Sequence, residues 1–129
     1  LQTQDGLQTQ LLEKASNLSG GQCQRLVIAR ALLRTDSAVY IFDEAASNID
    51  VESEELIMNV IHELAKTKTV LLISHRLANV VKSDKIYFLK DGEIKESGKH
   101  EELMSQNGAY RHLYESQMAL ENYGKGGMA

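Results

Sequence analysis

The sequence has a single cysteine, no long apolar run and no cluster of basic residues. Cys23 alone cannot form an internal disulfide, which is typical of a reducing compartment. Every apolar run is shorter than the roughly 18 to 20 residues that a membrane-spanning helix needs. The net charge is -4, whereas a surface that binds nucleic acid needs clustered Lys and Arg to neutralise phosphates. These absences argue against a disulfide scaffold, a membrane span and a nucleic-acid-binding surface.

The length and composition favour a single domain or part of one. With 129 residues, 43% of them apolar, the chain can bury one core but hardly two. It begins at Leu1 without an initiator methionine or a signal peptide, so we expect a piece of a longer protein. Residues 1–17 are polar and Gln-rich and predict a lead-in loop. The glycine-rich end, residues 121–129, predicts a flexible tail.

Residues 18–22 read Leu-Ser-Gly-Gly-Gln and lead directly into an apolar helix that we expect to end at residue 34. Ser19 is a good N-cap, and Gly20 and Gly21 leave backbone N–H groups unshielded by side chains. The positive end of the helix dipole points at the same place. The segment therefore predicts a site for a phosphate group. A flexible loop before an ordinary amphipathic helix is the alternative.

The middle of the chain predicts a parallel βαβ unit. Residues 38–42 and 69–73 are short apolar runs, typical of strands that are buried on both faces of a parallel sheet. Between them, residues 51–66 have apolar side chains every three or four positions, which indicates an amphipathic helix. Asp50 is a natural N-cap for this helix. The fold class predicted is therefore α/β.

Polar side chains follow both predicted strands. Asp43 and Glu44 come directly after the first strand, and His75 follows the second. Ligands of open α/β sheets bind at the carboxyl ends of the strands, so the three side chains together favour a site. An acidic loop and a helix-capping histidine are the alternatives. The sequence has no metal-ligand cluster and no Ser/His/Asp nucleophile arrangement.

The C-terminal part predicts a hairpin and helices. Asp91-Gly92 is a strong turn signal between two strands. The other elements expected here are a short helix at 76–82, strands at 84–90 and 93–97, and helices at 100–104 and 109–119.

In this order, the motifs resemble those of the C-terminal half of an ABC transporter ATP-binding domain. Residues 18–22 and the helix after them are similar to the family's signature, and residues 39–44 to its Walker B strand. Residues 45–50 resemble the D-loop and residues 74–76 the segment of the switch histidine. Each motif alone is moderately specific, but four in the family's order are very specific. Residues 98–103 are similar to the exporter branch in particular.

The resemblance implies a partial P-loop NTPase-type fold, with parallel buried strands and helices followed by a C-terminal β-hairpin and helices. All of it would be the C-terminal part of one ATPase domain. Its expected segments are the lead-in loop 1–17, the signature helix 18–34, the segment 38–98 from Walker B strand to hairpin, the C-terminal helices 99–120 and the tail 121–129.

The resemblance also implies a role for each residue after the strands. Asp43 would hold Mg²⁺ directly or through water, Glu44 would activate the attacking water, and His75 would contact the γ-phosphate of ATP. The enzyme expected is thus an ATPase with ATP and Mg²⁺ as cofactors. Such catalysis consists mainly of positioning and charge stabilisation.

The signature would serve a second subunit. In the family's head-to-tail dimer, Ser19, Gly20, Gly21 and Gln22 would contact the ATP that the partner ATPase domain holds, and Asp50 would cross the same interface. The expected partners are this second ATPase domain and a transmembrane domain, fused upstream. The resemblance places the protein at the cytoplasmic face of the inner membrane, in export, with no nucleic acid as partner.

Several family features are missing. No Gly-x-x-x-x-Gly-Lys-Ser/Thr P-loop occurs, nor do the adenine-stacking aromatic residue and the Q-loop glutamine. We therefore expect the chain alone to be inactive. In the D-loop, Asn48 and Ile49 replace the more usual Ala and Leu. Residues 9–15 keep the threonine and glutamate of the exporters' coupling motif but lose both of its glycines.

Two other functions are consistent with the motifs. The first is the C-terminal head segment of an SMC-type or repair ATPase that acts on DNA, which the acidic charge balance and the exporter-like strands disfavour. The second is a regulatory or assembly module without catalysis, which the presence of Asp43, Glu44 and His75 disfavours.

Overall fold

The computed structural model describes residues 6–126, and the chain divides into two compact units, Leu1–Ile73 and Ser74–Ala129. Each unit has a two-stranded sheet of its own, parallel in the first and antiparallel in the second. The division lies inside the segment 38–98 that the sequence groups together. Among residues 6–126, no helix is both long enough and apolar enough to cross a bilayer.

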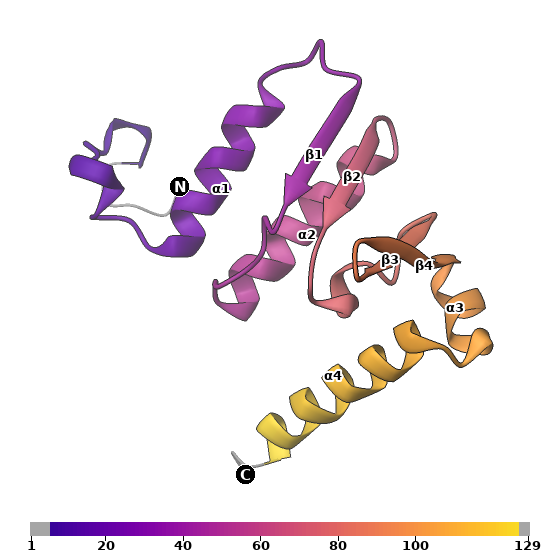
Figure 1. Cartoon of the computed structure of the whole chain (residues 1–129). Coiled ribbons are helices and arrows are strands. Elements are labelled where there is room, and N and C mark those ends of the chain that lie inside the picture. Colours follow the sequence, from indigo (N-terminus) through magenta and orange to yellow (C-terminus); the bar gives the residue numbers. More distant parts are fainter. Residues whose placement is uncertain (1–5, 127–129) are drawn as a thin grey trace. The chain divides into compact units, whose positions relative to one another are not determined.

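The first unit is a βαβ arrangement preceded by a helix, as the sequence predicts (Figure 1). Strands β1 and β2 are parallel, with Val39 opposite Thr69 and Asp43 opposite Ile73, and α2 connects them. The elements are η1 (Gly6–Gln8), η2 (Glu13–Ala15), α1 (Gly20–Leu32), β1 (Val39–Asp43), α2 (Val51–Ala65) and β2 (Thr69–Ile73).

The core of the first unit combines side chains of α1, β1, α2 and the loop after β1. Ile57 and Ile61 of α2 are 1% and 2% exposed, and their spacing of four residues is that of a helix face. The buried cluster consists of Ile28, Tyr40, Phe42, Ala45, Ala46, Ile57, Met58 and Ile61. The predicted amphipathic character of residues 51–66 is therefore confirmed.

The prediction that the strands are buried on both faces is wrong. Along β1, Tyr40 and Phe42 are buried, whereas Val39 and Ile41 are 56% and 65% exposed. Side chains alternate between the two faces of a strand, so one face of β1 joins the core and the other does not. In the part of the chain that the structure describes, no element of the first unit covers the second face. The apolar run shows that both faces of the strand are hydrophobic. A face is buried only where another layer of the protein packs on it.

The second unit is a β-hairpin followed by two helices (Figure 1). Asp91 and Gly92 form its turn with φ of 53° and 77°, as a tight hairpin requires, so this prediction is confirmed. The elements are η3 (Leu77–Asn79), β3 (Ile86–Lys90), β4 (Glu93–Gly98), α3 (His100–Gln106) and α4 (Ala109–Gly126).

Two elements of this unit differ in length from the sequence prediction. The helix expected at 76–82 is only the short η3, because the chain turns again after Val80. Helix α4 continues to Gly126, beyond the predicted end near residue 119 and into the predicted tail. The rest of the predicted tail, 127–129, lies outside the described residues. Glu121, which lies beyond the predicted end of the helix, bonds to the Arg76 guanidinium at 2.7 Å, and this contact favours the longer helix.

Tyr110 is the centre of the second unit. It is fully buried, and its hydroxyl lies 2.8 Å from His100 Nδ1. Its ring is nearly parallel to that of Tyr114 and packs edge-to-face with that of Phe88. The backbone N–H of Tyr110 donates to the Glu96 carboxylate at 2.9 Å, which caps the start of α4. One residue thus joins β3, β4, α3 and α4.

Candidate functional site

The signature segment forms a complete helix cap. The Ser19 hydroxyl accepts a hydrogen bond from Gln22 N–H at 3.1 Å, and the Gln22 side chain accepts one from Ser19 N–H at 2.9 Å. This reciprocal pair is a capping box. Ser19 and Gly20 are exposed, and the N–H groups of a helix's first turn have no acceptor within the helix. The predicted N-cap is therefore confirmed, whereas phosphate binding at this helix start stays a prediction.

Gly21 is buried where the start of α1 meets the start of α2. A Cβ atom at Gly21 would overlap Ser53 Oγ, and it would lie 2.7 Å from Ser53 Cβ and 3.0 Å from Asp50 Oδ1. Real Cβ atoms do not approach their neighbours so closely. The glycine therefore lets the N-termini of two helices lie side by side. Both positive dipole ends then act in one region of the first unit.

Replacing Gly21 by alanine should destabilise the first unit by about 1–3 kcal/mol, because the added methyl group must push the two helix starts apart. Gly20→Ala is the matched control, since a Cβ there would meet no atom within 4 Å. Urea unfolding followed by circular dichroism measures both variants. Equal unfolding midpoints for the two would contradict the tight packing at Gly21.

Asp50 lies next to the signature and caps α2. Its Oδ2 accepts from Ser53 N–H at 3.0 Å, which confirms the predicted N-cap. This backbone bond, then the Ser53 hydroxyl, and last the positive charge of Arg25 hold the pKa of Asp50 below its ordinary value. Arg25 itself reaches Ser53 Oγ at 3.5 Å. The signature and the last residue of the D-loop thus belong to one connected patch.

Asp43 and Glu44 lie at the carboxyl end of β1, as the sequence predicts. Asp43 is the last residue of the strand, opposite Ile73, and its side chain is exposed. Glu44 N–H donates to the Ile73 carbonyl at 2.9 Å, so the residue after the strand is still tied to β2. Glu44 has φ of 53°, a left-handed conformation that costs a non-glycine residue about 1 kcal/mol or more. The backbone therefore leaves the strand conformation at Glu44.

A second residue after β1, Asn48 in the D-loop, is also left-handed, with φ of 56°. Asparagine adopts this conformation more readily than alanine, since its short polar side chain can bond locally. The departure from the family's usual residue therefore has a backbone reason.

His75 belongs to the second unit, two residues after Ile73. Its side chain is exposed, and its backbone carbonyl accepts from Gln117 Nε2 at 2.7 Å. Because the two carboxylates belong to the first unit, the closeness of His75 to Glu44 stays a prediction. The structure does bring together Ser19, Gly21 and Asp50.

Sequence reasoning missed the residues that hold the predicted site residues in place. Gln117 and Glu121 of α4 contact the segment that contains His75, and Ser53 contacts Asp50. Tyr110, Tyr114, Gln117 and Glu121 follow the three- and four-residue spacing of one helix face. That spacing shows which face of α4 is inward, but not what it contacts.

The donor set fits a magnesium ion only in part. Mg²⁺ is usually held by one or two carboxylates and several waters, and Asp43 offers one exposed carboxylate at a strand end. Within residues 6–126, no three side chains of His, Cys, Asp or Glu gather as a metal site. Asp43 therefore fits as one ligand of such an ion, and the other ligands would have to come from outside this group of residues.

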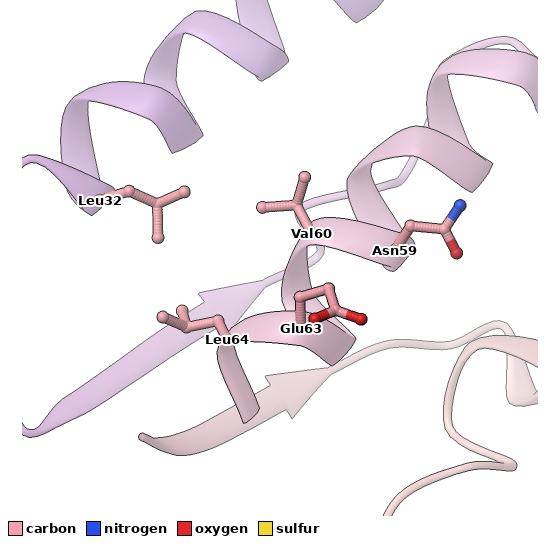
Figure 2. A pocket seen from close by; sticks show the side chains of 5 residues that line it. All are labelled: Leu32, Asn59, Val60, Glu63 and Leu64. Carbon is pink, nitrogen blue, oxygen red and sulfur yellow. The ribbon is translucent and has the colours of Figure 1, made fainter. Parts of the chain in front are cut away.

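A shallow apolar groove lies away from these motifs, between α1 and α2 (Figure 2). Leu32 of α1 faces Val60 and Leu64 of α2, and Asn59 and Glu63 complete the lining. The lining has no cationic group for a phosphate, and its one carboxylate, Glu63, pairs with Lys66 at 2.6 Å. We therefore assign it no part in the candidate site.

Comparison with known proteins gives matches along most of the chain. A family model described as ABC transporter matches residues 1–47. An uncharacterized ABC transporter ATP-binding protein of Haemophilus influenzae is 53% identical over 116 residues, which are 90% of this chain and 20% of that protein. An ATP-dependent lipid A-core flippase of Mannheimia succiniciproducens is 53% identical over 114 residues, 88% of this chain and 19% of the flippase. The chain thus spans about a fifth of the length of these relatives.

The fold has a solved counterpart too. A bacterial Atm1-family ABC exporter with ATP bound matches 90% of this chain, with a TM-score of 0.77 and 33% sequence identity, and the match covers 20% of the exporter chain. Both the α/β class and the order of the elements agree with the prediction of a partial ABC ATPase fold. In sequence and in fold, the chain therefore belongs to the ABC transporter ATP-binding family, among its exporter-like members.

Proposed function

We propose that this chain is part of the ATP-hydrolysing motor of an ABC exporter. The observation that carries the proposal is the match, over 90% of the chain, to an exporter with ATP bound. The chain also has Asp43 and Glu44 at a strand end and an exposed, capped helix start at Ser19. Transporter relatives favour this function over a DNA-acting ATPase head and over a regulatory module.

The reaction needs a base, and Glu44 is the candidate. Its carboxylate would take a proton from water as the water oxygen attacks the γ-phosphorus of ATP. The bond from that phosphorus to the bridging oxygen breaks, and ADP and inorganic phosphate leave. His75 would hydrogen-bond to the γ-phosphate and orient it. Asp43 would hold Mg²⁺, which when bound neutralises charge on the phosphate oxygens.

The signature is proposed to act on the ATP of a second subunit. The start of α1 supports this proposal, because Ser19 and Gly20 are exposed there and the positive end of a helix dipole suits a γ-phosphate. Ser19, Gly20, Gly21 and Gln22 would form this contact, and Asp50 would lie at the same interface. The partner is thus a second ATPase domain in a head-to-tail dimer.

We further propose that a transmembrane domain of the same protein couples hydrolysis to export, with the ATPase domain at the cytoplasmic face of the inner membrane. Relatives that are named lipid A-core flippases make a lipid-linked cargo the first to test.

The test compares phosphate release by the full-length transporter and by the isolated 129-residue chain. We expect hydrolysis of ATP only by the full-length protein, because the chain has no P-loop to hold the β- and γ-phosphates. No ATP hydrolysis by the reconstituted transporter would overturn the proposed motor function, whereas hydrolysis by the isolated chain would contradict only the expectation that the chain alone is inactive. Stimulation of hydrolysis by lipid A-containing vesicles over vesicles without it would support the lipid-linked cargo.

A further inference from the structure

Helix α4 holds the backbone on both sides of Arg76, directly beside the predicted switch histidine. Gln117 donates through Nε2 to the His75 carbonyl at 2.7 Å and accepts through Oε1 from Leu77 N–H at 2.9 Å. Glu121, one turn further along α4, pairs with the Arg76 guanidinium at 2.7 Å. Three consecutive residues are therefore fixed by one face of one helix.

The Gln117 amide fits this place in one orientation only. Its NH₂ group faces a carbonyl and its oxygen faces an N–H, so a flipped amide would bring two acceptors and two donors together. Both bonds are short and each has a backbone partner. The contact consequently restrains the peptide groups around Arg76 more than one hydrogen bond could.

The helix that carries Gln117 is itself well anchored. Tyr110, two turns earlier, is fully buried, and its backbone N–H is capped by Glu96. Leu77, which donates its backbone N–H to Gln117, is only 6% exposed. The anchored helix α4 thus holds the backbone of His75, a loop residue whose side chain is exposed. Functional side chains need support of this kind to keep their geometry to within about 0.5 Å.

We propose that Gln117 is a positioning residue for His75, and that α4 thereby sets the rate of ATP hydrolysis through the backbone of residues 75–77. The inference rests on the proposed function, since it assigns Gln117 to the same ATP site. Gln117 does not touch the nucleotide in this proposal. It acts by fixing the direction in which the His75 side chain leaves the backbone.

The experiment measures ATP hydrolysis by the full-length transporter with Gln117→Ala, Gln117→Glu, His75→Ala and the double variant Gln117→Ala/His75→Ala. Gln117→Ala should lower kcat about 10-fold with KM for ATP within about 2-fold, because an orienting contact is lost rather than a binding one. Gln117→Glu keeps the acceptor for Leu77 N–H but loses the donor to the His75 carbonyl, so it too should lower kcat. The double variant should equal His75→Ala alone, as expected when one residue acts through the other.

Glu115→Gln is the matched control, because this side chain is also on α4 but pairs with Arg111 instead of contacting residues 75–77. It should leave kcat unchanged. Hydrogen exchange gives a second readout: the Leu77 amide should exchange about 10-fold faster in Gln117→Ala but stay protected in Gln117→Glu.

The outcomes distinguish the proposed role of His75 in hydrolysis from the proposed role of Gln117 in positioning it. Wild-type hydrolysis by His75→Ala would overturn the proposed role of His75. An inactive His75→Ala together with full activity of both Gln117 variants would overturn the positioning role alone. An effect of Gln117→Ala that persists undiminished in the His75→Ala background would show a merely structural contact. If Gln117→Ala does not fold, Gln117→Glu decides.

Discussion

Replacing Glu44 by glutamine is expected to lower ATP hydrolysis by the full-length transporter at least about 100-fold, the usual scale for loss of a general base. The amide has the size of the carboxylate but almost no basicity, so the left-handed turn at residue 44 and its bond to Ile73 should persist. Binding of ATP should remain within about 2-fold, because Glu44 acts on the water and not on the bound nucleotide. Phosphate release measures the first quantity and titration with a fluorescent ATP analogue the second.

Glu52→Gln is the control for this experiment. Glu52 is an exposed acidic residue in the first turn of α2, so it shares the charge change but not the position at the strand end. It should hydrolyse ATP at the unmodified rate. A Glu44→Gln variant that keeps more than about half of the activity would contradict the assignment of Glu44 as the base.

Replacing Tyr110 by alanine is expected to lower the free energy of unfolding of the second unit by about 3–5 kcal/mol, as for other large buried side chains. The substitution removes a ring that contacts Phe88 and Tyr114, and it leaves a cavity where β3, α3 and α4 meet. It also removes the partner of His100 Nδ1. Urea unfolding of the chain, followed by circular dichroism, measures the loss.

Two further variants divide this effect. Burial, and then the neighbouring Tyr114, raise the pKa of the Tyr110 hydroxyl, so at neutral pH it stays protonated and can donate to His100. Tyr110→Phe keeps the ring and should lose only about 0.5–1.5 kcal/mol, the usual net contribution of one hydrogen bond. Tyr123→Ala truncates a tyrosine that is 84% exposed on the same helix, and it should be neutral within about 0.5 kcal/mol. An equal loss for Tyr110→Ala and Tyr123→Ala would contradict the central place of Tyr110.

The sequence by itself determined the elements and their motifs, because their signals are local. The three- and four-residue spacing of Ile57, Ile61 and Leu64 predicts α2. The dipeptide Asp91-Gly92 predicts the hairpin turn. Asp50 as an N-cap depends on residues no more than three positions away. The family likeness of the signature and of the Walker B strand is also written in short segments. None of these depends on what lies far away in the chain.

Only the tertiary structure decided which faces of these elements are buried and which distant residues contact them. An apolar strand gives no information on how many layers will pack on it, so the exposed face of Val39 and Ile41 was not predictable. The sequence predicts that Gly21 leaves a backbone N–H unshielded, but in the structure Gly21 is buried at the contact between two helix starts. Gln117 reaches the His75 carbonyl across 42 positions of the sequence, and no local pattern encodes such a hydrogen bond. Packing between distant segments fixes these features, and it exists only in the folded chain.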